Sequence, residues 1–173
     1  MESHVKLLGH PVHPMLIVLP LGLLSSAVLF DAIYLITGND ALVEVAFWNI
    51  TLGVIGGLAA AIFGAIDWWA IPRETRAKQI GLVHGGGNVV VVGLFLVSWL
   101  LRLPDHAYAP NLLPFVLGLV AVILALGTAW LGGELVFRLR VGVDHDASLN
   151  APSSLSGSAG SQRESGETAD AAG

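Results

Sequence analysis

The sequence lacks cysteine altogether and carries few charged residues. Without cysteine the chain has no disulfide, no thiolate metal site, no cysteine-held iron–sulfur cluster and no thioether-linked haem. Lys and Arg number 8 against 13 Asp and Glu, and the net charge of −5 offers no basic footprint for nucleic acid. Charged residues make up only 12% of the chain, against about 25% in typical globular proteins.

Apolar residues take the place of the missing charge. They make up 54% of the 173 residues, and the mean hydropathy is +0.74. A soluble domain of this size buries only part of its surface and could not hide so much apolar area from water. The composition therefore excludes an ordinary soluble enzyme and predicts a protein whose solvent is lipid.

Four apolar runs divide the chain. They cover about 15–37, 45–71, 80–101 and 112–136, and each has the roughly 20 residues that a helix needs to cross a bilayer. Helices satisfy their own backbone groups, and short connections make consecutive helices antiparallel. We therefore predict an all-α integral membrane protein, with an antiparallel bundle of four transmembrane helices in residues 1–144.

The basic residues predict the orientation of this bundle. Arg102 alone falls on one side of the predicted membrane. The other basic residues of the bundle fall on the opposite side, which should be the cytoplasm and should also hold both termini. These are Lys6, Arg73, Arg76, Lys78, Arg138 and Arg140. The alternative for the first run is a signal peptide cleaved near Ser25-Ser26-Ala27. A single lysine before the run, and apolar residues continuing past that site, favour a retained span.

Residues 145–173 differ from the rest of the chain. They are acidic, rich in Ser, Gly and Ala, and contain no aromatic residue. Such a segment cannot bury enough surface to offset the entropy of ordering it. We predict a disordered cytoplasmic tail without chemistry of its own.

Ligand-type side chains from all four spans should converge near the cytoplasmic face. His10 and His13 precede the first span, Asp67 ends the second, His84 and Asn88 lie early in the third, and Glu134 lies near the end of the fourth. Because both histidines of the first segment precede proline, the sequence predicts that both are non-helical.

Each of these residues also has a structural interpretation. The histidines before the first span could cap it, Asp67 beside two tryptophans could mark the membrane interface, and Glu134 could pair with Arg138. His84 is hardest to explain in this way, because an ionisable group inside an apolar span is costly and usually faces a partner. At the opposite face, Asp31 and Arg102 are candidates for a structural ion pair, which Asn49 and Thr51 could join.

Small residues at every fourth position predict close helix packing. We expect these residues to build the monomer's own bundle; a homodimer face is the alternative. In the second span they are Gly53, Gly57, Ala61 and Ala65, and in the fourth they are Ala121, Ala125, Ala129 and Gly133. Pro20 should disturb the first span, because it lacks a backbone donor.

Three functions fit this pattern. The first is a b-type haem or other redox cofactor, with His84 and either His10 or His13 as axial ligands, Asn88 orienting a ring, and Gly85 to Gly87 making room. The second is a metal site that needs no cysteine, with ligands drawn from His10, His13, His84, Asp67 and Glu134. The third is a cofactor-free accessory or scaffold protein whose polar cluster fixes helix order. Transport is weaker, because the polar residues gather at one face.

Several motifs resemble an uncharacterised bacterial family catalogued as domain of unknown function 2231. The resemblance covers about residues 7–144. It rests on Gly9-His10-Pro11-Val12-His13-Pro14, Leu19-Pro20-Leu21-Gly22, Asp67-Trp68, His84 with Asn88, and Gly132-Gly133-Glu134-Leu135-Val136. It implies a four-helix protein of the bacterial inner membrane without assigning an activity. Some family members carry a Rieske-type domain, which implies a respiratory or redox partner.

Overall fold

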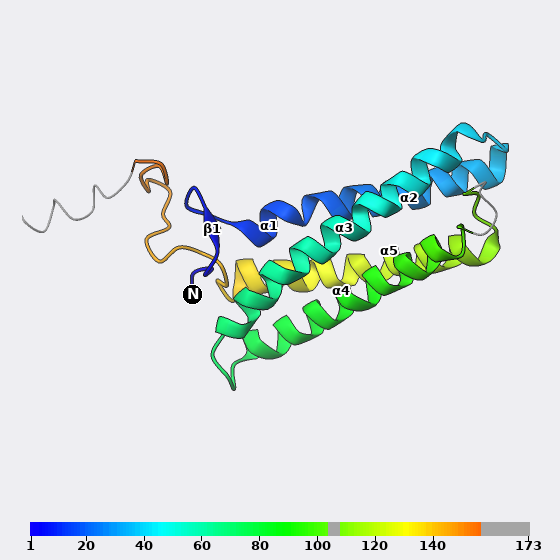
Figure 1. Ribbon diagram of the computed structural model, residues 1–173. Helices are drawn as coiled ribbons and strands as arrows, with labels where there is room; N and C mark the ends of the chain where they lie inside the picture. Colours follow the sequence, from blue (N-terminus) through cyan, green and yellow to red (C-terminus); the bar gives the residue numbers. More distant parts are fainter. Residues whose placement is uncertain (104–107, 157–173) are drawn as a thin grey trace, which may run out of the picture.

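The computed structural model describes residues 1–103 and 108–156, and these form an elongated bundle of long helices (Figure 1). A short hairpin of two strands precedes the bundle. In chain order the elements are β1 (Lys6–Leu7), β2 (His10–Pro11), α1 (Val12–Leu16), α2 (Val18–Thr37), α3 (Ala41–Ala70), α4 (Arg76–Leu100), α5 (Leu112–Gly133) and the π-helix η1 (Glu134–Arg138).

The prediction of four membrane-spanning helices is confirmed. The helical segments long and apolar enough to cross a membrane are Val12–Thr37, Ala41–Ala70, Arg76–Leu100 and Leu112–Arg138. The first three begin three or four residues before the predicted apolar runs, and the fourth ends two residues after its run. Thr75, for example, accepts a hydrogen bond from the backbone N–H of Lys78 and so starts α4 before the apolar residues begin.

The helices form two antiparallel hairpins that pack side by side. The N-terminal hairpin comprises α1, α2 and α3, and the C-terminal hairpin comprises α4, α5 and η1. Contacts of α3 with α4 and of α2 with α5 join the two hairpins. The N-terminus, the α3–α4 connection and the end of η1 lie together (Figure 1). We call this the termini end, and the other end the far end.

The first span is interrupted at Ile17, between α1 and α2. Pro20 accounts for the break, because it has no N–H to bond the carbonyl of Leu16 one turn earlier. This confirms the disturbance predicted at Pro20. The prediction that His13 is non-helical is wrong: His13 lies within α1, whereas His10 is in the extended strand β2. A residue before proline is tolerated in the first turn of a helix, because the backbone N–H groups there have no partner within the helix.

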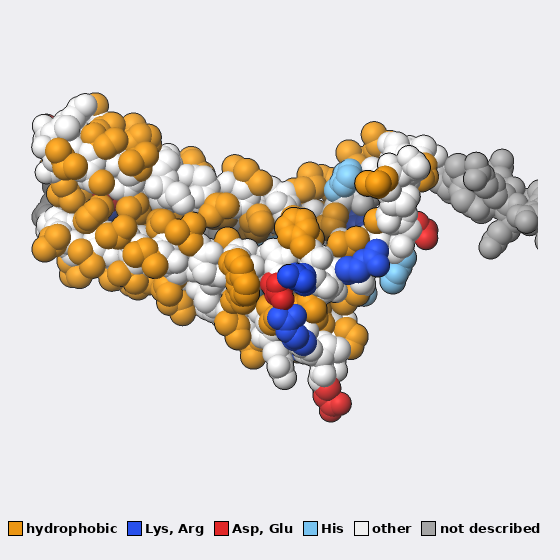
Figure 2. Space-filling view, turned by 180° about the vertical axis from the view of Figure 1, so that it is seen from behind, with side chains coloured by type: hydrophobic (Ala, Val, Ile, Leu, Met, Phe, Trp, Pro, Cys, Tyr) orange, Lys and Arg blue, Asp and Glu red, His pale blue; other side chains and the backbone are white. Residues whose placement is uncertain are grey.

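Apolar side chains fill the middle of the bundle. The buried cluster draws on α2, α3, α4 and α5 and consists of Leu24, Ala27, Val28, Ala46, Ile50, Val54, Val91, Phe95 and Ala121. Apolar side chains also cover most of the outer face seen in Figure 2, where Lys, Arg and His side chains gather toward the termini end. Such an apolar outer surface is suited to a lipid bilayer.

A buried ion pair closes the far end. Arg102 donates to Asp31 through two nitrogens, Nη1 to Oδ1 at 2.9 Å and Nη2 to Oδ2 at 2.6 Å. Nη2 also lies 3.3 Å from Oγ of Ser98, which donates to the carbonyl of Pro114. The predicted pairing is therefore present.

Asn49 and Thr51 do not join this pair. Asn49 donates to Ser26, and Thr51 accepts from the indole N–H of Trp99. Both residues therefore contact neighbouring helices separately from the ion pair.

The ends of the chain contain structure that the apolar pattern did not indicate. Leu8 and Gly9, with φ of 52° and 84°, form the two-residue turn between β1 and β2, and such a turn requires positive φ at both positions. Of the tail predicted to be disordered, residues 145–156 contain no helix or strand, and Ser154 Oγ lies 3.3 Å from Nε2 of His10. Residues 157–173 lie outside the described residues.

Candidate functional site

His13 of α1 and His84 of α4 meet inside the termini end of the bundle. Their ring centroids are 6.4 Å apart, and the ring planes are nearly perpendicular at 87°. The two residues come from different hairpins, and each is half-buried. Of the ligand-type residues that the sequence singled out, these two are brought together.

Each histidine is anchored to the antiparallel partner helix of its own hairpin, α3 for His13 and α5 for His84. Nδ1 of His13 lies 2.8 Å from the carbonyl oxygen of Ala60 in α3, and Nδ1 of His84 lies 2.8 Å from the carbonyl oxygen of Thr128 in α5. A carbonyl can only accept, so each Nδ1 carries the proton. In the neutral imidazole each Nε2 then carries the lone pair, and that of His84 faces Nδ2 of Asn88.

Glycines allow both rings to approach these helices closely. A Cβ on Gly64 would lie 2.8 Å from Cε1 of His13, and a Cβ on Gly132 would lie 3.1 Å from Cε1 of His84. Each glycine comes four residues after the carbonyl that its histidine contacts. The two hairpins therefore hold their histidines by the same local device.

The same spacing continues along both helices. Buried or half-buried small residues follow one another at intervals of four, three and four. They are Gly53, Gly57, Ala60 and Gly64 in α3, and Ala121, Ala125, Thr128 and Gly132 in α5. This alternation keeps residues on one face, because seven residues make nearly two turns. The small-residue series predicted from the sequence therefore holds for its first two positions in each helix, Gly53 and Gly57 in α3 and Ala121 and Ala125 in α5.

The prediction is wrong at the last two positions of the series in α3 and at Ala129 of the series in α5. Ala61, Ala65 and Ala129 are exposed. A strict interval of four residues advances roughly 40° around the helix at each step, so such a ridge turns away from the core within three steps. The residues that cradle the histidines, Gly64 and Gly132, were missed for this reason, although small residues near both positions were the available signal.

Polar side chains add further contacts to His84. Asn88, one turn later, lies with its Nδ2 3.4 Å from Nε2 of His84 and donates to the His84 carbonyl at 2.9 Å. Its Oδ1 accepts from the hydroxyl of Thr128 at 3.0 Å. Asn88 thus places an amide N–H toward the second ring nitrogen of His84.

The glycine triplet after His84 lies mainly on another face. Gly85 and Gly86 are exposed, and a Cβ on either would meet open space within 4 Å, whereas a Cβ on Gly87 would lie 2.6 Å from Cγ2 of Thr128. Gly87 therefore allows α4 and α5 to approach. The room around the histidine rings comes from Gly64 and Gly132.

The other predicted ligands have different neighbours. His10 is exposed in β2 beside Ser154, and Asp67 Oδ1 accepts from the Ser3 hydroxyl and the His4 backbone N–H at 2.7 and 3.1 Å. Glu134 pairs with Arg76 at 2.7 Å, across helices, and not with Arg138. Within residues 1–103 and 108–156, no three His, Asp or Glu side chains gather as a metal-binding group.

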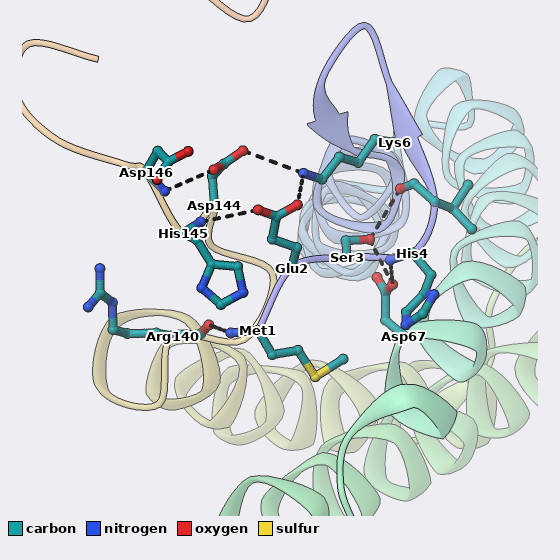
Figure 3. Close-up of polar contacts among 11 residues, drawn as sticks. Met1, Glu2, Ser3, His4, Lys6, Asp67, Arg140, Asp144, His145 and Asp146 are labelled. Carbon is teal, nitrogen blue, oxygen red and sulfur yellow. Dashed lines mark hydrogen bonds and ion pairs between the residues drawn. The ribbon is translucent and has the colours of Figure 1, made fainter. Parts of the chain in front are cut away.

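Residues 1–6 and 140–146 form a polar cap over this end of the bundle (Figure 3). The Met1 ammonium donates to the carbonyl of Arg140, and Lys6 bridges Glu2 at 2.6 Å and Asp144 at 3.5 Å. The hydrogen bond from Lys6 lowers the pKa of Glu2 below its ordinary value, and the bond to Glu2 raises the pKa of Lys6. The contact of Asp67 with residues 3 and 4 joins this cap to α3.

Comparison with known families identifies the chain. A family model described as "Predicted membrane protein (DUF2231)" matches residues 9–145. The chain belongs to this family. The match includes both histidines of the pair and extends just past Asp144 of the cap. No curated protein and no solved structure matches the chain.

Proposed function

We propose that this family member is a multi-pass protein of the bacterial inner membrane whose His13–His84 pair binds one redox-active metal centre. The occupant is a b-type haem iron or a single transition-metal ion, and both present the same chemistry to the protein, a metal that accepts lone pairs from imidazole nitrogens. The observation that carries the proposal is the geometry of the two rings.

The spacing of the rings fits a shared metal. Metal–nitrogen distances of about 2.0–2.1 Å on both sides place the centroids of two in-line imidazoles roughly 6.4 Å apart, and the observed separation is 6.4 Å. Metal-binding histidines commonly donate their other ring N–H to a carbonyl. Both Nδ1 atoms face such a carbonyl, at Ala60 and Thr128. A bound metal would supply one-electron chemistry, while the protein fixes the two rings.

Purified protein in detergent tests this proposal by its absorption spectrum and elemental analysis after expression with haem and metals supplied. We expect bound haem or metal in the unaltered chain and its loss in His13→Ala or His84→Ala. His10→Ala is the matched control and should retain the centre, because His10 lies in the exposed strand β2. A colourless, metal-free protein under these conditions contradicts the proposal.

A cofactor-free scaffold is the second candidate. The contact of Asn88 Nδ2 with Nε2 of His84 favours it, because that contact gives the second ring nitrogen a partner within the protein. In this case His84→Ala should lower stability while the unaltered chain carries neither metal nor a haem absorbance. The same two measurements therefore separate the candidates.

The proposed orientation places both termini in the cytoplasm. All described Lys and Arg residues except Arg102, which is buried, lie at the termini end, as the positive-inside rule requires for a cytoplasmic face. The absence of cysteine allows a direct test by labelling single introduced thiols with a membrane-impermeant maleimide. Asn39→Cys should react from outside the inner membrane, and Ser153→Cys only after lysis. The reverse pattern contradicts the orientation.

A further inference from the structure

The two hairpins bring corresponding residues together at both ends of the bundle. His13 meets His84 at the termini end, and Asp31 meets Arg102 at the far end. Each pair joins the first span to the third, and the members of each pair are 71 positions apart. Both spans run in the same direction, from the termini end to the far end (Figure 1). A shift of 71 positions therefore carries the first span onto α4 and the turn that follows it.

Buried residues of the second and fourth spans also correspond, at a shift of 68 positions. Every buried residue of α5 falls on a buried residue of α3. The pairs are Ala46 with Pro114, Ile50 with Gly118, Gly53 with Ala121, and Ala60 with Thr128. Gly64 and Gly132, which cradle the histidines, are related by the same shift. In the first and third spans the corresponding buried pairs are Leu24 with Phe95 and Ala27 with Ser98.

The correspondence extends to the backbone where each hairpin ends. The N–H of Ile71, after α3, and the N–H of Leu139, after η1, each donate to the carbonyl three residues earlier. Three residues further along, the chain has a positive φ in both hairpins, 66° at Glu74 and 78° at Gly142. These features are again 68 positions apart. The hairpins therefore match in their backbone as well as in their buried faces.

The two contacting pairs define a two-fold axis. In an interface between two equivalent units, a residue contacts its own equivalent only where it lies at the axis. His13 contacts His84 and Asp31 contacts Arg102, so the axis passes between both pairs and runs along the bundle. The same rotation exchanges the two surfaces that join the hairpins, α3 with α4 and α2 with α5.

We infer that the chain is a fused dimer of two equivalent helical hairpins, which pack through one self-complementary interaction surface. The partner that this surface fits is a second hairpin of the same kind, and the chain supplies that partner itself. The inference stands apart from the function proposed above, because it requires no ligand. It adds one condition to that function: a group held between the two rings lies on the axis and meets corresponding residues from both hairpins.

The ion pair shows why the two hairpins are not identical at the axis. An exact repeat would place two like charges in contact in the buried far end, where an uncompensated charge is costly. Asp31 on one side and Arg102 on the other remove that cost while keeping the contact. At the termini end, Asn88 and Thr128 correspond to Ile17 and Ala60.

Exchanging the ion pair in the full chain tests the equivalence at the far end. Asp31→Arg and Arg102→Asp each bring like charges together and should lower the midpoint of unfolding by dodecyl sulfate in mixed micelles. The double variant should recover most of that loss, and one no more stable than either single variant overturns the inference.

A serine added to the exchanged pair separates equivalence from simple charge attraction. Ser98 Oγ lies 3.3 Å from Nη2 of Arg102, and Ser98 corresponds to Ala27. Ala27→Ser should therefore raise the midpoint of the exchanged double variant, in which the arginine is at position 31, and should not raise that of the unaltered chain. The same effect in both backgrounds contradicts the equivalence.

The termini end offers an independent test, which decides the matter even if the charge variants do not fold. Ile17→Asn alone places an amide one turn after His13 without a hydroxyl to fix it, and should lower the midpoint. Ala60→Ser adds the hydroxyl that Thr128 supplies to Asn88, and should recover most of that loss when the two changes are combined. Ala61→Ser is the matched control, because Ala61 is adjacent but exposed. Equal recovery with both serines, or recovery with neither, overturns the equivalence of the hairpins.

Discussion

Removing one partner of the Asp31–Arg102 pair should strongly destabilise the bundle. The side chains of Arg102 and Asp31 are 0% and 1% exposed and are joined by two hydrogen bonds. A single substitution, Asp31→Leu, leaves the guanidinium buried without its counter-charge, which costs about 3–5 kcal/mol in comparable buried pairs. Replacing both residues, with Asp31→Leu and Arg102→Met, removes the buried charge and should recover most of that loss.

The Arg76–Glu134 pair provides a control in the same molecule. Its N–O distance of 2.7 Å nearly equals the 2.6 Å of the buried pair, but the Arg76 side chain is 60% exposed. Arg76→Met should therefore cost only about 0.2–1 kcal/mol, because water screens exposed pairs.

The free energies of unfolding are measured by titrating the protein in mixed micelles with dodecyl sulfate. Tryptophan fluorescence reports the unfolding. A cost for Asp31→Leu no larger than that of Arg76→Met would refute the reasoning from burial. So would a double variant less stable than Asp31→Leu, because the double variant no longer contains an unpaired buried charge.

Two further predictions concern the termini end. Gly64→Ala should lower the free energy of unfolding by about 1–3 kcal/mol, because the new Cβ would lie 2.8 Å from His13 Cε1. Gly86→Ala is the control: its new Cβ would meet nothing within 4 Å, so it should be neutral or stabilising in the same assay. Because Lys6 lowers the pKa of Glu2, that contact stabilises the cap at neutral pH and is lost as the pH falls through the lowered pKa. Amide exchange protection of residues 1–11, corrected for intrinsic rates, should fall below about pH 4; a loss at the same pH in Lys6→Met would count against this cause.

The position of charge along the chain was enough to predict the bundle. Apolar runs long enough to span a membrane identified all four helices, and the short connections indicated antiparallel neighbours. Asp31 and Arg102 could be paired because they are ionisable groups close to apolar spans at the same end. These inferences depend on the cost of charge in lipid, which is large and does not require knowledge of side-chain packing.

The candidate site was predicted less completely, because it depends on contacts between helices. The sequence placed His13 and His84 at the same depth but could not exclude His10. The depth of His10 depends on whether residues 10–13 are extended or helical, because three residues cover a longer distance in a strand than in a helix. The helix that begins at Val12 decides the matter, because it includes His13 and leaves His10 in the strand before it. Asp67 and Glu134 lie near the same end, yet their partners, Ser3 and Arg76, come from distant parts of the chain that no local pattern connects.

The apolar core has a consequence for the energetics of any reaction at the histidine pair. Polar contacts in the described residues separate into a group around His84, Asn88 and Thr128 and another near the far end, and the buried cluster between them consists of apolar side chains. Among the described residues, this cluster supplies no polar side chain that would link the two groups. A proton that binds at the histidines and leaves toward the same end makes no net crossing of the bilayer, so the membrane potential, worth about 2.3 kcal/mol per charge at 100 mV, would neither drive nor oppose that exchange.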